Sequence, residues 1–332
     1  MNKECSPQSQ ISSHPGPILV VGATGFLGSN VSLQLLESGL SSVLHMRSPV
    51  QGLTPGQLAL ADLTTPGAVA RLVGSVVPAG VINCAALADV DSCERQPDLA
   101  RRINAEVPGE LAAACSAVGA WLVHVSTDAV FGDLTEPVVE SSEVSPINVY
   151  GRTKADGEAA VLEHSANALV VRTNIVGWSP TGTRSLLEYF WNGLTVGTTL
   201  RGFSDVWFRP IPVTTLWPLV QSWLEHEQPG VPIRHATGTR LLSKYDFGRC
   251  VAEEFGFDPS LVTAASAIEG GLLARRQHRL DVLPSEAGPG FDGARYPREA
   301  QAGLSALQDL ANSGLRSQLG GFVRASTDEE DG

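Results

Sequence analysis

A tyrosine and a lysine stand four residues apart in the segment Tyr150-Gly-Arg-Thr-Lys154. In an α-helix this spacing places both side chains on one face. A neighbouring positive charge lowers the pKa of a tyrosine, which lets the phenol exchange a proton with a substrate oxygen near neutral pH. The spacing therefore predicts a proton-transfer pair. The alternative is a solvent-exposed pair on a helix.

Two hydroxyl residues, Ser126 and Thr127, follow the mostly apolar run from Trp121 to Val125. If that run is a strand of a parallel sheet, its carboxyl end lies at the edge where such sheets bind ligands. Either hydroxyl could donate a hydrogen bond to a substrate carbonyl as negative charge develops on its oxygen. The alternative, a hydroxyl that only stabilises a turn, suits Ser126 better than Thr127.

Three more residues, Asp128, Asn174 and Arg209, are assigned to the substrate side of this site. Arg209 could meet a substrate phosphate, with a structural ion pair as an equal alternative. Cys84 ends a segment expected to be a buried strand, and we interpret it as a small apolar residue rather than a reactive thiol. The seven histidines have no metal-ligand spacing, so we expect no metal.

Three glycines, Gly22, Gly25 and Gly28, lie between the apolar run Ile18–Val21 and a helical stretch that reaches Gly39. Between a strand and a helix, the first glycine permits a tight turn and the second lets the backbone approach a pyrophosphate. The third lets the helix pack closely on the strand. The helix N-terminus adds unpaired N–H groups and a positive dipole end. The pattern predicts a dinucleotide site, with an ordinary strand-to-helix turn as the alternative.

The residue after the second expected strand indicates which dinucleotide is bound. An acidic residue there usually holds the ribose 2′-hydroxyl of NAD, whereas an arginine accommodates the 2′-phosphate of NADP. This chain has Arg47 in the segment His45-Met-Arg-Ser48, so we expect NADP(H) in preference to NAD(H), with a solvated loop arginine as the alternative. Asp62 could accept a hydrogen bond from the adenine amino group or belong to an Asx turn.

Strands alternate with helices along the first half of the chain. The expected strands are Ile18–Val21, Ser42–Met46, Ala59–Asp62, Gly80–Cys84, Trp121–Ser126 and Ala168–Thr173. The expected helices are Gly67–Val73, Asp98–Val118 and one beginning near Val149, besides the helix after the glycine loop. This alternation predicts an α/β fold with a doubly wound parallel sheet of Rossmann type.

Residues beyond about 175 are richer in proline, and we expect a smaller C-terminal substrate-binding domain there. The expected divisions are a flexible leader (1–16), the Rossmann domain (17–175), a mainly substrate-binding region (176–323) and an acidic tail (324–332). Some segments of the third division should return to the sheet. The segment Ser243-Lys-Tyr-Asp246 predicts a capping box that opens a helix.

Composition excludes several classes of protein. A chain of 332 residues that is 43% hydrophobic can bury a large core, and its net charge of -12 argues against a nucleic acid partner. Five widely spaced cysteines without paired spacing favour a reducing cytoplasm. No segment approaches the ~20 apolar residues of a membrane span.

Several of these segments together resemble the extended short-chain dehydrogenase/reductase family, most closely its dTDP-4-dehydrorhamnose reductase branch. They are Gly22-Ala-Thr-Gly-Phe-Leu-Gly28, Asn83-Cys-Ala-Ala86, Ser126-Thr-Asp128 and Tyr150-Gly-Arg-Thr-Lys154. The resemblance implies that Tyr150 is the general acid/base, that Lys154 contacts the nicotinamide ribose and tunes Tyr150, and that Thr127 orients the carbonyl. Together with the glycine pattern and Arg47, it leads us to expect a cofactor site formed by Gly22, Thr24, Gly25, Phe26, Leu27, Gly28, Arg47, Asp62, Leu63, Ala85, Ala86, Asn104, Tyr150 and Lys154, in which Asn104 belongs to the supporting hydrogen-bond network.

The chain departs from that branch at positions on the substrate side. Ala129 stands where the branch has a tyrosine, and Cys84 stands where it has alanine. We therefore expect an NADPH-dependent reductase of a carbonyl on a nucleotide-activated or related small sugar. Two alternatives remain: an epimerase or dehydratase that recycles its cofactor, and a non-catalytic NADP-binding regulatory subunit. The expected partner is a small molecule, with a homodimer as the candidate assembly.

Overall fold

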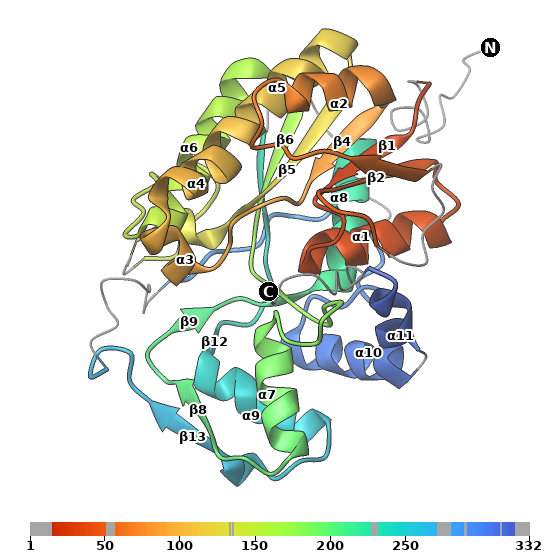
Figure 1. Ribbon diagram of the computed structural model, residues 1–332. Coiled ribbons are helices and arrows are strands. Elements are labelled where there is room, and N and C mark those ends of the chain that lie inside the picture. The colour runs from red at the N-terminus through yellow and green to blue at the C-terminus, as the bar shows by residue number, and fades with distance from the viewer. Residues whose placement is uncertain are drawn as a thin grey trace, which may run out of the picture.

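A computed structural model describes residues 15–50, 57–132, 134, 136–226, 232–270, 280–288, 291–312 and 314–322. The expected leader, apart from residues 15 and 16, and the expected acidic tail lie outside these residues. A seven-stranded sheet, parallel throughout, occupies the upper part of the molecule (Figure 1). Its order is β11-β6-β5-β4-β1-β2-β3, which confirms the predicted doubly wound fold.

The sheet contains seven strands: β1 (Ile18–Val21), β2 (Ser42–Met46), β3 (Leu58–Leu60), β4 (Gly80–Asn83), β5 (Trp121–Thr127), β6 (Ala168–Thr173) and β11 (Ile233–Ala236). The chain leaves β1 in one direction towards β3 and in the other towards β11. The loops after β1 and β4 therefore begin side by side at the point where the strand order reverses, which is where such sheets bind ligands.

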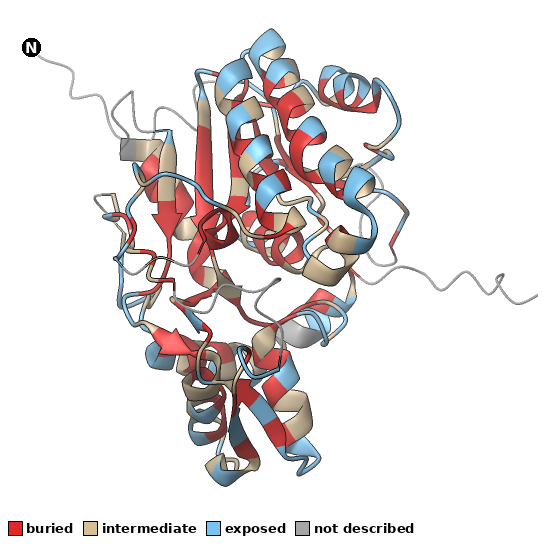
Figure 2. Ribbon diagram, turned by 90° about the vertical axis from the view of Figure 1, so that its left-hand side faces the viewer, coloured by how far each residue is buried: buried red, intermediate tan, exposed pale blue. Residues whose placement is uncertain are grey.

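Alternate residues of each strand face opposite layers of helices. Ile18 and Val20 belong to the apolar core beneath α1 (Phe26–Glu37) and α8 (Val213–His226). Leu19 and Val21 belong to the core beneath a second layer of helices. This layer comprises α2 (Ala68–Val76), α5 (Val107–Val118) and α6 (Val149–His164). Figure 2 shows the sheet as a continuous buried region between the two layers.

Two predicted elements differ from the structure. Strand β3 ends at Leu60, so Asp62 lies in the following turn rather than at a strand end. The long helix expected over 98–118 is α4 (Pro97–Arg101) followed by α5, with a π-helical segment (Arg102–Glu106) between them. Short helix α3 (Val90–Arg95) precedes α4. π-Helical segments often occur at functional sites, and this one carries Asn104.

A smaller lobe below the sheet is built from later residues (Figure 1). Its strands are β7 (Ile175–Val176), β8 (Leu200–Phe203), β9 (Trp207–Phe208), β10 (Ile211–Pro212), β12 (Leu242–Ser243) and β13 (Val262–Ala265). Its helices are α7 (Leu186–Thr195), α9 (Lys244–Glu254), α10 (Ala300–Asn312) and α11 (Leu315–Gly320). The predicted start of α9 is confirmed, because the Ser243 hydroxyl accepts the Asp246 N–H at 3.0 Å. Among the described residues, no helix is long and apolar enough to cross a bilayer.

A buried ion pair fastens α6 to the sheet. Arg172 of β6 and Glu158 of α6 meet at 2.7 Å, with side chains 3% and 5% exposed. The Ser126 hydroxyl of β5 also donates to Glu158, at 2.5 Å. Removing one partner of such a pair leaves the other charge buried without a partner, which destabilises the fold by about 3–5 kcal/mol. The pair therefore fixes the position of the helix that carries Tyr150 and Lys154.

We expect the free energy of unfolding to fall as the pH drops below about 6.5. Burial lowers the pKa of His45, His124 and His235 from their usual value of 6.5. Each is neutral in the folded chain at pH values where the unfolded chain binds a proton. Each therefore lowers the free energy of unfolding by about 1.4 kcal/mol for every unit that the pH falls between its unfolded pKa and its lowered pKa in the folded chain. Urea unfolding midpoints at about pH 7.5 and pH 5.5 measure the effect.

His235→Gln isolates one of these contributions. The His235 imidazole lies 3.5 Å from the Arg172 guanidinium, so protonation would place two like charges together. Glutamine does not titrate, so the slope of stability against pH should be smaller in this variant. His164→Gln, at an exposed position of α6, is the matched control and should keep the wild-type slope. Identical slopes in all three proteins would contradict the prediction.

Candidate active site

The glycine loop has the predicted strand–turn–helix form, with no room for a side chain at Gly22 or Gly28. Gly22 has a φ of 79°, in the left-handed region that favours glycine. A Cβ on Gly22 would lie 2.8 Å from the Ala85 nitrogen, and one on Gly28 would lie 2.2 Å from the Gly22 carbonyl oxygen. Backbone therefore packs directly on backbone where the loops after β1 and β4 meet.

The N-terminus of α1 is left open by this loop. Gly25 is its N-cap and supplies no side-chain cap, and the first turn contains no acidic residue. Thr24 lies in the turn, and Phe26 and Leu27 begin the helix. Uncapped N–H groups at a helix N-terminus attract phosphate groups. The local geometry thus suits the pyrophosphate that the glycine spacing predicts.

His45 supports the loop from the neighbouring strand. Its Nδ1 accepts the Gly22 N–H at 3.3 Å, and its Nε2 lies 3.0 Å from the Ala61 carbonyl oxygen. These partners require the neutral Nε2–H tautomer, in agreement with the pKa that burial lowers. His45 was not among the residues expected at the site, although an imidazole within an otherwise apolar strand was a usable signal.

The loops after β2 and β3 carry the residues expected beside the adenosine. Arg47 is exposed at the end of β2, and Asp62 is exposed in the turn. Asp62 Oδ1 accepts the Thr64 N–H at 3.0 Å and the Thr64 hydroxyl at 2.7 Å, so the Asx-turn alternative is present. These hydrogen bonds, and to a smaller extent the charge of Arg47, lower the pKa of Asp62. Leu63 is buried beneath the turn.

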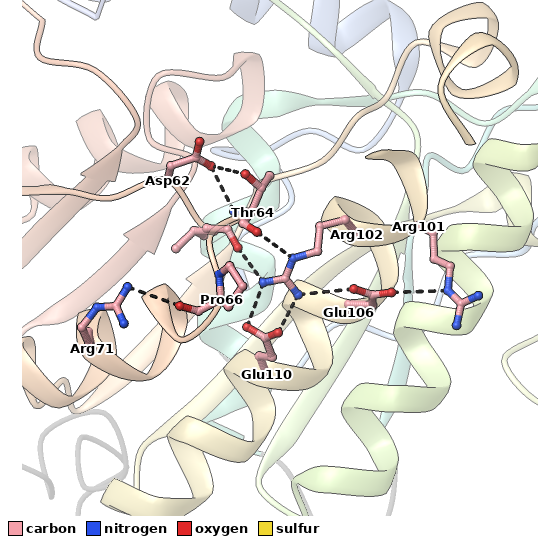
Figure 3. Close-up of polar contacts among 9 residues, drawn as sticks. Asp62, Thr64, Pro66, Arg71, Arg101, Arg102, Glu106 and Glu110 are labelled. Carbon is pink, nitrogen blue, oxygen red and sulfur yellow. Dashed lines mark hydrogen bonds and ion pairs between the residues drawn. The ribbon is translucent and has the colours of Figure 1, made fainter. Parts of the chain in front are cut away.

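Arg102, in the π-helical segment, links the loop after β3 to α5 (Figure 3). Its guanidinium donates to the Leu63 carbonyl at 2.9 Å and to the Thr64 carbonyl at 3.3 Å. The same side chain contacts Glu110 at 2.5 Å and Glu106 at 3.5 Å. The π-helical segment therefore contacts the adenosine side of the candidate site through Arg102.

Asn104, in the same π-helical segment, fixes the loop after β4. Its Oδ1 accepts the Leu87 N–H at 2.8 Å, and its Nδ2 donates to the Leu87 carbonyl at 3.0 Å. Nδ2 also lies 3.1 Å from the Thr153 hydroxyl of α6. Asn104 is therefore a buried support that ties the loop of Ala85 and Ala86 to α6.

Tyr150 and Thr127 lie together at the carboxyl end of β5. Burial raises the pKa of the half-buried Tyr150 to about 12, and its contact with the Thr127 hydroxyl offsets part of that rise. Thr127 Oγ1 also accepts the Ala129 N–H at 3.1 Å and lies 3.2 Å from Asp128 Oδ1. The structure thus brings the expected phenol and hydroxyl into contact, with the phenol protonated at neutral pH.

The Lys154 amine makes its hydrogen bonds with β5. Its Nζ donates to the Val125 carbonyl at 2.8 Å and lies 3.2 Å from His124 Nε2. Burial lowers the pKa of Lys154 to about 8, although Glu158 and Cys84 oppose that shift. The expected lowering of the Tyr150 pKa by Lys154 is wrong for this arrangement, because burial of the phenol dominates and the amine faces β5.

The residues expected on the substrate side divide into two groups. Asn174 donates to the buried Asp128 at 2.8 Å, beside Thr127. Burial raises the pKa of Asp128, while Asn174 and the charge of Lys244 oppose that rise. Arg209 instead pairs with Asp281 at 2.5 Å and donates to the Thr239 carbonyl, so it forms the structural ion pair that was its alternative.

Cys84 lies at the end of β4 near Lys154, which is the group that partly offsets the effect of burial on its thiol. Burial raises the pKa of Cys84 to about 12. A thiol must ionise to act as a nucleophile, so this one is inert near neutral pH. The interpretation of Cys84 as a small apolar residue agrees with its surroundings.

Most of this chain is similar to known proteins. A family model described as the RmlD substrate binding domain matches residues 16–283. A dTDP-4-dehydrorhamnose reductase of Mycolicibacterium smegmatis is 34% identical over 94% of this chain and 87% of its own length. Methionine adenosyltransferase 2 subunit beta of Pongo abelii is 35% identical over 88% and 82%. The crystal structure of a dTDP-4-dehydrorhamnose reductase ortholog from Clostridium acetobutylicum has a TM-score of 0.74 at 28% identity, covering 89% of this chain and 99% of that one.

Gly28→Ala should weaken both the fold and dinucleotide binding. The added Cβ would meet the Gly22 carbonyl oxygen at 2.2 Å, so the loop must shift. Overpacking of this kind costs about 1–3 kcal/mol. Urea unfolding and titration with the dinucleotide measure the two losses. Gly74→Ala, at an exposed helical position with nothing within 4 Å, is the control and should be neutral or slightly stabilising. Wild-type behaviour of Gly28→Ala would refute the close packing.

Proposed function

This chain belongs to the RmlD substrate-binding domain family, and from that membership we propose that it is an NADPH-dependent reductase of a ketone on a nucleotide-activated sugar. One observation carries the proposal: Tyr150 contacts the Thr127 hydroxyl at the end of β5, and Lys154, one helical turn further on, donates to the Val125 carbonyl of the same strand. The dTDP-4-dehydrorhamnose reductase at 34% identity supports the substrate class.

The residues present fit a dinucleotide. Gly22 and Gly28 keep backbone where a Cβ would collide, and the uncapped N-terminus of α1 faces the same turn. Arg47, exposed after β2, would meet a 2′-phosphate, and Lys154 would hold the nicotinamide ribose. When bound, NADPH supplies the hydride that reduces the carbonyl carbon.

The proton side of the reaction belongs to the chain itself. The Thr127 hydroxyl would turn from Asp128 to donate a hydrogen bond to the substrate carbonyl oxygen. Tyr150, protonated at neutral pH because burial raises its pKa to about 12, would give its proton to that oxygen. Hydride added at carbon and a proton added at oxygen together convert the ketone to an alcohol. Asp128 and Asn174 would contact the sugar beside it.

A second candidate function has its own support. Methionine adenosyltransferase 2 subunit beta is as similar in sequence as the reductase, and its name makes it a subunit of a larger enzyme. The alternative is therefore a non-catalytic subunit that binds NADP(H).

Tyr150→Phe should reduce turnover by roughly 10²–10⁴-fold, the usual contribution of a general acid. NADPH affinity should stay within about twofold, since only the phenolic oxygen is lost. The assay follows NADPH absorbance and product mass with a panel of nucleotide 4-keto-sugars. Tyr189→Phe, at an exposed tyrosine of α7, is the control.

The outcomes of this assay separate the candidates. Undiminished turnover in Tyr150→Phe would refute the assigned role. Retained cofactor that is not consumed while product forms would indicate an epimerase or dehydratase. No turnover on any ketone, together with copurification of a larger enzyme, would favour the subunit.

Arg47→Ala should raise the Kd for NADPH by about tenfold or more and leave that for NADH nearly unchanged. A charge-assisted hydrogen bond to phosphate contributes about 1.5–3 kcal/mol. Calorimetric titration with both nucleotides measures the difference. Arg201→Ala, at an exposed arginine of β8 in the smaller lobe, removes the same charge away from both loops and should have no effect. Tighter binding of NADH than NADPH by the wild type would overturn the assignment of Arg47.

A further inference from the structure

The Lys154 amine has a buried partner that the proposed reaction does not use. His124 is fully buried in β5, and its Nε2 lies 3.2 Å from Lys154 Nζ. Behind it, His124 Nδ1 lies 3.0 Å from Asn83 Nδ2. Lys154 and Asn83 are each 1% exposed. The three side chains form a hydrogen-bonded row that begins in β4, crosses β5 and ends on α6.

The hydrogen-bond partners determine where the protons of this row lie. Asn83 Oδ1 accepts the Ala85 N–H at 3.2 Å, so the Asn83 amide group donates to His124 Nδ1. The neutral imidazole then carries its proton on Nε2, which points at Lys154 Nζ. Nζ can accept a hydrogen bond from that ring N–H only when the lysine is a neutral amine. One of its own N–H groups donates to the Val125 carbonyl.

Protonation of Lys154 must therefore rearrange the row. An ammonium group has no acceptor, so His124 Nε2 would have to accept from it and the ring proton would move to Nδ1. The Asn83 amide would then turn to present its oxygen to the ring, and the Ala85 N–H would lose that acceptor. Burial and the charge of Lys154 keep the pKa of His124 well below 6.5, so the imidazole does not take the extra proton itself.

The other charged and titratable groups around Lys154 leave it close to this change. Cys84 faces it from the end of β4, and Glu158 lies one turn further along α6. Glu158 is already paired with Arg172 of β6, which limits its hold on the amine. The pKa of Lys154, about 8, lies within the range where both of its forms are populated. Around Tyr150 the facing groups are Asp128 and Cys93.

We propose that His124 is a positioning residue for Lys154, which holds the amine at β5 and couples each gain of a proton there to a change of tautomer on its own ring. The inference deepens the proposed function, because Lys154 belongs to its catalytic set. A catalytic lysine held in this way alternates between two defined hydrogen-bonding states.

Nitrogen NMR of the full chain, labelled with ¹⁵N in the histidine rings, tests the proposal without turnover. The His124 ring should be protonated on Nε2 above about pH 8 and on Nδ1 below it, and Lys154→Met should abolish the change. Through-bond correlation to the His124 amide assigns the signals, so no folded His124 variant is needed. One tautomer throughout, or the same change in Lys154→Met, would overturn the proposal.

Enzyme kinetics provide a second test of the role of His124 if the wild type reduces a ketone. His124→Gln keeps an amide that can donate or accept but cannot change tautomer, so kcat should fall roughly tenfold and the pH profile should shift. KM for the ketone should stay within about twofold, and His124→Leu should be more impaired than His124→Gln. His164→Gln is the control. An unchanged pH profile in His124→Gln would count against the proposal, whereas an inactive wild type bears only on the proposed function.

Discussion

Contact between backbone segments at the centre of the sheet determines where everything else can lie. The Gly22 carbonyl oxygen touches Gly28 of α1, and Gly22 itself touches Ala85 after β4. No side chain separates these segments, so α1 packs closely on β1 and begins directly at the turn that follows this strand. The same contact brings the loop after β4 to the edge where β5 delivers Thr127. Cofactor and substrate sides of the candidate site therefore share one backbone support.

Helix α6 joins that support through polar groups removed from water. Its ion pair with Arg172 reaches β6, the Ser126 hydroxyl reaches β5, and Asn104 links Thr153 to the loop after β4. Each contact satisfies a group that would otherwise be buried without a partner, at considerable cost. The helix is consequently fixed in rotation as well as position. Tyr150 faces Thr127 and Lys154 faces His124 for that reason.

Burial, more than pairing of charges, sets the proton states of this site. It raises the pKa of Tyr150 and Asp128 and lowers that of Lys154 and His124, in each case towards the neutral form. A protonated phenol is the form that reduction of a carbonyl requires. A lysine that loses its proton readily, beside a histidine that does not gain one, makes the hydrogen-bond pattern around Nζ depend on pH.

The sequence by itself determined the elements and the types of residue at their ends. The pattern of apolar residues and the glycine spacing predicted β1, the turn after it and α1. The alternation of strands and helices predicted the parallel sheet. The spacing of Tyr150 and Lys154 placed both on α6, but not the directions of their side chains. Only the tertiary structure decided that Lys154 meets His124, that Arg209 pairs with Asp281 and that Arg102 holds the loop after β3. These contacts join residues far apart in the chain, and the folded backbone sets both their distances and their burial.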